Sequence, residues 1–251
     1  MRFADSADSH AHSLKTLNLL YEYDDFMASI ATMVDLGCGS GLDLEWWATR
    51  TTRDEIPVPL NINCVGIDIQ ETIPVATKYP NIKYKKLDFE GTLNMQPGTS
   101  YDVLWCHDAF QYALNPTQTL AKWWHLAAEG SMLAITVPRT LVYRHNVENF
   151  IQQDNAYYHH TLVSLIHMLS VTGWDCRSGF FQQADTSPWI QAIVYRSSQE
   201  PKDIRKTTMY DLVESKLLPE SAEKSIMSHG YLRQQDLTLP WLDHSLTWMG
   251  K

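Results

Sequence analysis

The chain has 251 residues, of which 44% are hydrophobic and 20% are charged, and its formal net charge at pH 7 is −9. This composition supports one sizeable apolar core, and the acidic balance disfavours a nucleic-acid partner, because binding to a phosphate backbone needs a basic face. The apolar runs are strand-sized, so we expect no membrane-spanning segment.

The N-terminal part of the chain is expected to be helical. Residues 1–15 are polar and lack the apolar stretch of a signal peptide. Between residues 12 and 30, leucines and aromatic residues recur at near-helical spacing, which predicts one amphipathic helix. We assign residues 1–30 to an N-terminal cap helix region that either folds over a ligand site or serves only as a packing helix.

The most informative stretch runs from Met33 to Gly41 and has the sequence Met-Val-Asp-Leu-Gly-Cys-Gly-Ser-Gly. It predicts an apolar strand that leads into three glycines at alternate positions, and a helix follows from Leu42 to Thr49. Glycines let the backbone turn with positive φ and let a ligand approach the main-chain N–H groups. Such a strand-to-helix turn is where open α/β sheets bind their ligands.

Phosphate ligands fit this turn poorly. A P-loop needs a lysine after Gly41, and the dinucleotide fingerprint needs a glycine where the chain has Leu42. Asp35, Asp43 and Glu45 also place carboxylates around the N-terminus of the helix, where they would repel a pyrophosphate. A ligand with an adenosine-like body and a cationic end fits better.

The glycine spacing of residues 35–41 resembles motif I of the class I S-adenosylmethionine-dependent methyltransferases. The resemblance implies an α/β fold with a doubly wound, mostly parallel seven-stranded sheet, helices on both faces and a C-terminal antiparallel strand. It also implies that the cofactor is S-adenosyl-L-methionine, bound in part by Asp35, Gly37, Cys38 and Gly39. A glycine-rich turn of some other α/β protein is the alternative.

Further strand ends follow in the order that this family uses. We predict these strands at 64–69, 82–87, 101–107 and 131–137. By resemblance, Asp68 binds the ribose hydroxyls with Ile69 beside the adenine, and Asp88 and Phe89 meet the adenine amino group and ring face. An aspartate at a strand end is also common as a turn former or helix cap, so each assignment has a structural alternative.

The strand at 101–107, the fourth of the chain when the strand before the glycines is counted, ends with Cys106 and His107. This strand end resembles motif IV, where the chain borders both the methionine end of the cofactor and the substrate. Cys106 is therefore a predicted cofactor contact. If the acceptor is a hydroxyl or an acidic carbon, His107 is the first candidate for the catalytic base, because a near-neutral imidazole can take that proton. A purely local hydrogen bond of His107 is the alternative. The following loop is a candidate substrate-binding segment and contains Asp108, Phe110, Gln111 and Tyr112. Of these, we predict Tyr112 as a substrate contact.

We expect the core domain to span residues 31–196, with an insertion at about 138–160. This insertion is rich in arginine, tyrosine and histidine, and is either a substrate lid or a surface connection. Tyr143 and His145 within it are predicted substrate contacts. Helices are predicted at 116–128 and 162–172, and a final antiparallel strand pair at Phe180-Phe181 and 189–195.

Residues 197–251 form a polar C-terminal extension with one predicted helix at 209–217. Its terminal tryptophans suggest that it packs back on the core or supports a homodimer. The four cysteines have no C-x-x-C spacing, which is typical of reduced thiols in a cytoplasmic protein, and the ten histidines have no metal-ligand spacing. We therefore predict no metal and no disulfide framework.

Three functions remain open at this stage. The leading one is a methyltransferase that acts on a small-molecule acceptor by in-line displacement at the sulfonium methyl. The second is a methyltransferase that modifies a protein or RNA. The third is a non-catalytic binding module that keeps the cofactor fold. The Asn/Asp-Pro-Pro sequence of base-methylating relatives does not occur after the fourth strand, which further disfavours a nucleic-acid acceptor.

Overall fold

The computed structural model describes residues 6–71, 73–94, 100–138, 158, 160–183 and 189–240. Their centre is a seven-stranded sheet with the strand order β3-β2-β1-β4-β5-β7-β6. The strands are β1 (Thr32–Leu36), β2 (Asn63–Asp68), β3 (Ile82–Lys86), β4 (Tyr101–His107), β5 (Ala127–Pro138), β6 (Trp174–Gln182) and β7 (Trp189–Arg196). Strands β1 to β5 pair in parallel, whereas β7 pairs antiparallel with both β5 and β6. This confirms the predicted sheet.

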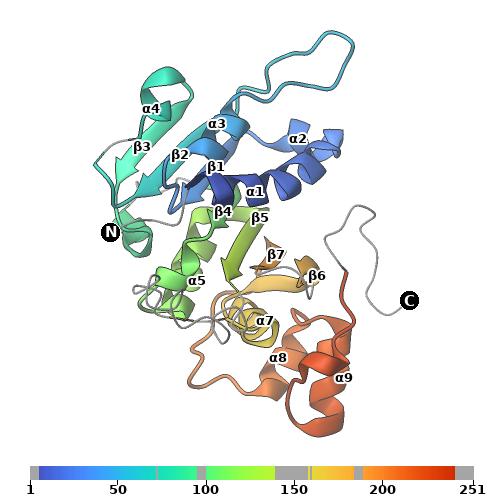
Figure 1. The fold of residues 1–251 in the computed structure, drawn as a ribbon. Coiled ribbons are helices and arrows are strands. Elements are labelled where there is room, and N and C mark those ends of the chain that lie inside the picture. The colour runs from blue at the N-terminus through green and yellow to red at the C-terminus, as the bar shows by residue number, and fades with distance from the viewer. Residues whose placement is uncertain are drawn as a thin grey trace.

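Helices cover both faces of the sheet (Figure 1). They are α1 (Ser6–Tyr21), α2 (Asp24–Ser29), α3 (Leu42–Ala48), α4 (Val75–Lys78), α5 (Pro116–Leu126), α7 (Leu162–Val171), α8 (Met209–Ser215) and α9 (Glu220–His229), with the short 3-10 helices η1 (Phe89–Asn94), η2 (Phe110–Tyr112) and η4 (Gln234–Asp236). The alternation of strand side chains produces two cores. Val34 and Leu36 of β1 join the core beneath α5 and α7, whereas Met33 joins the core beneath α1 and α3.

The predicted single helix from 12 to 30 is two helices in the structure. Helix α1 begins earlier, at Ser6, and ends at Tyr21, and α2 begins at Asp24. Tyr23 lies between them with φ −101° and ψ 87°, outside the helical region. Two aspartates in the first turn of α2 favour a new helix start there, because carboxylates stabilise helix N-termini. The hydrophobic spacing alone did not show this break.

The C-terminal extension packs against the edge strand β6. The backbone N–H of Cys176 donates to the carbonyl of Leu217, and that of Phe181 donates to the carbonyl of Pro240, both at 2.9 Å. Apolar side chains of the extension, Leu212, Leu218 and Ile226 among them, join the core beneath α7. The extension therefore covers an edge whose N–H and C=O groups would otherwise be open to pairing with another chain.

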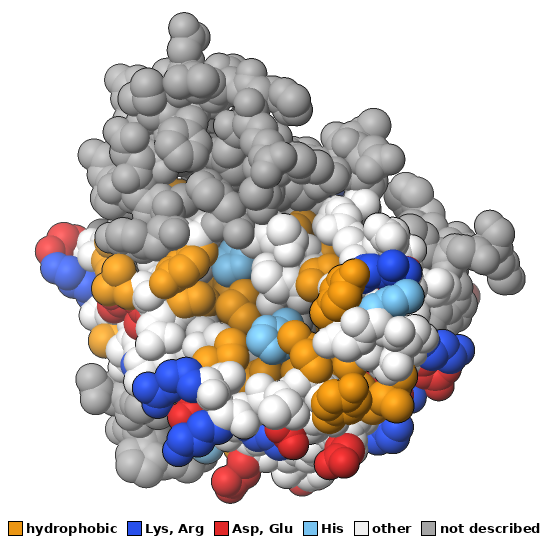
Figure 2. Space-filling view, turned by 90° about the horizontal axis from the view of Figure 1, so that it is seen from below, with side chains coloured by type: hydrophobic (Ala, Val, Ile, Leu, Met, Phe, Trp, Pro, Cys, Tyr) orange, Lys and Arg blue, Asp and Glu red, His pale blue; other side chains and the backbone are white. Residues whose placement is uncertain are grey.

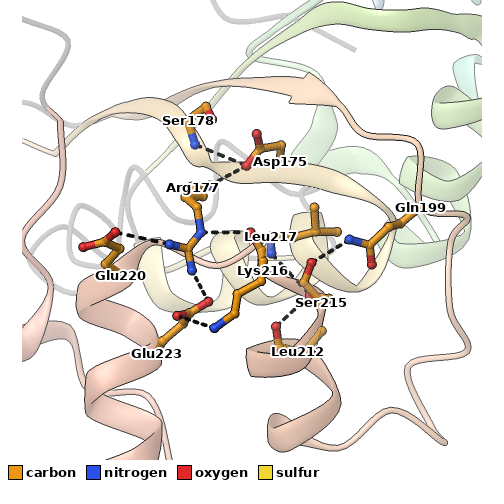
Figure 3. Close-up of polar contacts among 10 residues, drawn as sticks. All are labelled: Asp175, Arg177, Ser178, Gln199, Leu212, Ser215, Lys216, Leu217, Glu220 and Glu223. Atoms are coloured by element: carbon orange, nitrogen blue, oxygen red, sulfur yellow. Dashed lines mark hydrogen bonds and ion pairs between the residues drawn. The ribbon is translucent and has the colours of Figure 1, made fainter.

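Arg177 of β6 binds to both α9 and the C-terminal end of α8 in the extension (Figure 3). Its Nε donates to the carbonyl of Lys216 at 3.0 Å, and its two terminal nitrogens bind the carboxylates of Glu220 and Glu223. Lys216 also approaches Glu223 at 3.4 Å. One guanidinium group thus joins β6, the end of α8 and the start of α9.

Figure 2 shows the molecule from below, where hydrophobic and histidine side chains lie together between groups of acidic and basic ones. The basic side chains on this face do not gather into one continuous patch. Within the part of the chain that the structure describes, no helix is long and apolar enough to cross a membrane.

We predict that Arg177→Ala lowers the free energy of unfolding by about 1–2 kcal/mol, because it removes several charge-assisted hydrogen bonds from a partly buried position. The matched control is Arg205→Ala, whose partner Asp203 is two residues away and whose side chain is 85% exposed. This control should change the stability by less than about 0.5 kcal/mol. Urea unfolding of both variants measures the difference. Equal losses of stability in the two variants would contradict the role of Arg177 in holding α8 and α9 on β6.

Candidate functional site

The glycine turn between β1 and α3 forms one wall of the candidate site. Gly37, Gly39 and Gly41 have φ values of 86°, 52° and 83°, in the left-handed region that favours glycine. The N–H groups of Gly37 and Cys38 donate to the carbonyl of Ile67 at 2.8 and 3.1 Å. These bonds hold the turn against the carboxyl end of β2.

The three glycines have different surroundings. A Cβ on Gly37 would lie 2.4 Å from the Cβ of Ala109, and one on Gly41 would lie 2.4 Å from a methyl group of Val75. A Cβ on Gly39 would meet no atom within 4 Å. Two of the glycines are therefore required by close packing, whereas Gly39 faces open space in which a ligand can approach the backbone.

Asp68 lies at the end of β2 and is only 9% exposed. Its Oδ2 accepts a hydrogen bond from the N–H of Gly39 at 2.9 Å, and its Oδ1 accepts one from the N–H of Gln70 at 3.1 Å. Each carboxylate oxygen keeps a lone pair for a further donor, such as a hydroxyl. Ile69, the next residue, is 53% exposed. The structure thus brings Asp68 directly to the glycine turn.

Asp35 is buried beneath the same turn. Burial raises the pKa of Asp35 well above its usual range, and the carboxylates of Asp43 and Asp68 raise it further. Burial also raises the pKa values of the Cys38 and Cys106 thiols, so both are protonated at neutral pH. Cys106 lies in the core beneath α5 and α7, which makes it a packing residue as much as a site residue.

The predicted adenine contacts Asp88 and Phe89 lie at the same edge of the sheet but differ in exposure. The Asp88 side chain is exposed and accepts a hydrogen bond from the N–H of Glu90 at 2.9 Å. The Phe89 ring packs 5.9 Å from that of Trp123, and one of its ring carbons lies 3.7 Å from where a Cβ on Gly37 would be. Phe89 therefore borders the glycine turn.

Asp43, in the first turn of α3, connects α1 to the site. Its carboxylate contacts Nδ1 of His10 at 2.5 Å, accepts from the Ser13 hydroxyl at 2.6 Å and accepts from Nε1 of Trp105 at 2.7 Å. Three elements, α1, α3 and β4, thus meet at one carboxylate. In the sequence, Asp43 was interpreted only as a charge that disfavours phosphate, because its partners Ser13 and Trp105 lie far from it along the chain.

His107, the predicted catalytic residue, is buried and lies in a cluster of rings with the partly buried His12 of α1 and Trp189 of β7. Its Nε2 is 3.1 Å from Nδ1 of His12, and the Trp189 ring lies 5.3 Å from that of His12 and 5.9 Å from that of His107. Burial lowers the pKa of both histidines to about 4, so both imidazoles are neutral at pH 7. His12 and Trp189 were not predicted as site residues, since nothing in the local sequence links positions so far apart.

Of the three predicted substrate contacts, the structure describes Tyr112 only. Tyr112 is partly buried at the end of η2, and burial raises the pKa of its phenol. Tyr143 and His145 lie outside the described residues. Among the residues that the structure does describe, no group of three or more His, Cys, Asp or Glu side chains is arranged to hold a metal ion.

Residues 34–135 match the profile of a family described as a methyltransferase domain. Among solved structures, an O-methyltransferase family protein from Burkholderia thailandensis is similar, with a TM-score of 0.55 and 16% identity over 75% of this chain and 57% of that one. The CurJ carbon methyltransferase has a TM-score of 0.50 and 15% identity over 67% of this chain and 49% of that one.

The plantazolicin methyltransferase BamL, solved with a triazolic desmethylPZN analog and SAH, has a TM-score of 0.55 and 14% identity over 77% of this chain and 88% of that one. The present chain spans only about half the length of the CurJ and Burkholderia structures. At such identities the likeness concerns the fold. No curated protein sequence matches the chain.

We predict that Asp43→Ala lowers the free energy of unfolding by about 2–4 kcal/mol, because it leaves the buried Nε1–H of Trp105 without its acceptor and removes the contacts of Ser13 and His10 with α3. Hydrogen exchange should also quicken in α1 before it quickens in β4. The control Asp25→Ala alters an exposed aspartate of α2 and should cost less than about 0.5 kcal/mol. Unchanged exchange in α1 would show that Asp43 does not hold this helix.

Proposed function

The chain belongs to the class I S-adenosylmethionine-dependent methyltransferase family, and from this premise we propose that it transfers the methyl group of S-adenosyl-L-methionine to a small-molecule acceptor. The observation that carries the proposal is the partly buried cluster of the His12, His107 and Trp189 rings at α1, a helix that also binds Asp43 just after the glycine turn. The cofactor supplies a methyl group that is already activated by its sulfonium. The protein must then mainly orient the acceptor and exclude water.

The residues of the turn fit this cofactor. Gly39 leaves open space beside its backbone, and both Asp68 oxygens can accept further hydrogen bonds, as a ribose diol requires. The neighbouring carboxylates of Asp35 and Asp43 favour a ligand with cationic groups over one with phosphates. The predicted contacts of Gly37, Cys38, Ile69, Asp88, Phe89 and Cys106 with the cofactor are part of this proposal.

A small acceptor is supported by the way α1 crosses the site. Ser13 binds Asp43 and Thr16 donates to the Gln191 side chain at 3.2 Å, so this helix is joined to both α3 and β7. A helix fixed at these points closes one side of the cluster that contains His12 and His107. A site that is covered on this side favours a compact substrate over a folded macromolecule.

We propose that His107 contacts the methyl acceptor and acts on its hydroxyl or amine proton. Its imidazole is neutral at pH 7, so it can accept a hydrogen bond or a proton from the acceptor, and its contact with His12 fixes the ring. Tyr112, Tyr143 and His145 are proposed as further substrate contacts.

Calorimetric titration with S-adenosylmethionine, S-adenosylhomocysteine and NAD tests the cofactor assignment. We expect the first two to bind and NAD not to bind. Asp68→Asn should weaken S-adenosylhomocysteine binding about 10- to 100-fold, because one oxygen that accepts hydrogen bonds becomes a donor. Binding of NAD without binding of the adenosylmethionine ligands would refute the proposal. Methyl transfer to a protein or RNA but to no small molecule would refute its acceptor class.

We predict that Gly39→Ala weakens S-adenosylhomocysteine binding at least about tenfold, because the new methyl group would occupy the open space beside the turn. Gly130→Ala is the matched control, since Gly130 has φ 73° and likewise no atom within 4 Å of an added Cβ. Each substitution should cost about 1–2 kcal/mol of folding stability, because both place alanine in the left-handed region. If Gly130→Ala weakens binding equally, the effect is not local to the site.

A further inference from the structure

We propose that the carboxylate of Asp108, held by Gln111, binds the O–H or N–H group of the acceptor and receives its proton during methyl transfer. This inference rests on the proposed function and extends it, because it assigns the acceptor to hydroxyl or amine compounds. Asp108 follows His107 at the end of β4, and nothing in the motif comparison selects it above its neighbours in the loop.

Asp108 lies at the correct edge of the sheet. Its N–H donates to the carbonyl of Thr136 at 3.0 Å, which continues the pairing of β4 with β5 by one residue. The next residue, Ala109, is the one that a Cβ on Gly37 would strike. Asp108 is thus one residue from His107 and one residue from the contact with the glycine turn.

The backbone of Asp108 is held in an uncommon conformation, with a φ of 54°. Left-handed backbone at a residue other than glycine costs about 1–2 kcal/mol, although aspartate and asparagine tolerate it better than most. Such conformations persist where the surrounding structure enforces them, and they gather at functional sites. Here the enforcement comes from the bond to Thr136 on one side and the packing of Ala109 on the other.

Gln111 holds the Asp108 side chain and presents an acceptor of its own. Its Nε2 donates to Oδ1 of Asp108 at 2.7 Å and to the Asp108 carbonyl at 3.1 Å. The Gln111 residue is 2% exposed, and its Oε1 is buried with no hydrogen-bond partner among the described residues. A buried acceptor without a partner is costly, which indicates that a donor from a ligand completes it.

In the proposed site, these two side chains together offer hydrogen-bond acceptors to a ligand. A carboxylate and an amide oxygen complement O–H and N–H groups and disfavour carboxylate or phosphate ligands. Burial raises the pKa of Asp108 to about 7, whereas the hydrogen bond from Gln111 opposes this rise. Asp108 can therefore take up and release a proton near neutral pH, which the His107 imidazole, with a pKa of about 4, does less well.

The titratable neighbours of Asp108 carry no competing charge at neutral pH. Among the described residues, Cys106 of β4 and Tyr112 of η2 interact electrostatically with Asp108, and both have raised pKa values. His107 is neutral, and the partner on β5 is the uncharged backbone of Thr136. The ionisation of Asp108 is thus governed by its burial and by Gln111.

The proposed step balances as follows. The oxygen or nitrogen of the acceptor forms a bond to the methyl carbon, and the methyl–sulfur bond breaks with its electron pair passing to sulfur. The acceptor's proton passes to the Asp108 carboxylate. The positive sulfonium and the negative carboxylate are both neutralised, and the carboxyl group afterwards returns its proton to solvent.

Asp108→Asn tests the assignment, because asparagine keeps the shape and tolerates the positive φ. The assay follows radiolabelled methyl transfer from S-adenosylmethionine to a panel of small phenols, alcohols and amines. We expect kcat to fall about 100-fold or more while S-adenosylhomocysteine affinity stays within about twofold. In the wild type, kcat/KM should fall as pH drops through about 7, and the variant should lose this limb.

Three companion variants sharpen the result. Gln111→Met should move the limb to higher pH, because the hydrogen bond that lowers the Asp108 pKa is lost. Glu129→Gln, at an exposed position at the opposite end of β5, should change nothing. His107→Gln should retain the limb, and its loss in that variant with retention in Asp108→Asn would transfer the role to His107 and overturn the proposal.

A ligand-binding measurement distinguishes a wrong role for Asp108 from a wrong proposed function. The same panel is screened by ligand-observed NMR against the protein saturated with S-adenosylhomocysteine. Hydroxyl and amine compounds should bind the wild type and bind Asp108→Asn at least about tenfold more weakly. Equal binding would overturn the role of Asp108 alone, and so would a large loss of S-adenosylhomocysteine affinity in this variant. Absence of any small-molecule binding or transfer by the wild type would overturn the proposed function.

Discussion

The Asp43 carboxylate is the interaction on which the architecture of the site depends. It receives hydrogen bonds from α1 and β4 while itself belonging to α3, so one buried side chain fixes the relative positions of three elements. The contact between His12 and His107 depends on the position of α1, which Asp43 helps to fix. The site is therefore made by tertiary contacts of the N-terminal helix as much as by the sheet, and these contacts use the polar residues Ser13 and Thr16, which are buried in α1 beside Leu17 and Leu20.

The glycine turn could be predicted because its chemistry is local. The turn is recognised from alternate glycines between an apolar strand and a helix, and these glycines have positive φ in the structure. The ends of β2 and β4 follow from strand patterns of the same kind. The strand order then follows from the family resemblance. Asp68 could likewise be placed, because the carboxyl ends of parallel strands meet at one edge.

What the sequence could not supply is pairing between distant residues. Nothing in the spacing of His12 and His107 indicates that their rings touch, and Asp43 differs from any other aspartate in a first helical turn only through Ser13 and Trp105. The break between α1 and α2 was not predicted, because hydrophobic residues continue at helical spacing across it. The packing of the extension on β6 could not be predicted either, because the contacts of Arg177 with Lys216 and Glu223 appear only in the folded structure.

The extension also changes how a homodimer can be pictured. Because backbone groups of Leu217 and Pro240 already pair with β6, a second copy cannot add a strand at these positions without displacing them. A dimer through the extension, which stays a prediction, would have to use its outer surface. Exposed apolar side chains do occur there, including Tyr210, Met227 and Tyr231, but single exposed hydrophobic residues are normal on monomers.

Burial gives the two ends of the site different electrostatic properties, and both suit a cationic methyl donor. At the glycine turn, burial raises the pKa of Asp35 and the carboxylates of Asp43 and Asp68 raise it further, so a bound cation would relieve the repulsion among these groups. Under α1, burial keeps His12 and His107 neutral, which removes the repulsion that two imidazolium groups would exert on a sulfonium. The same desolvation that makes these histidines weak bases therefore makes their position compatible with the cofactor.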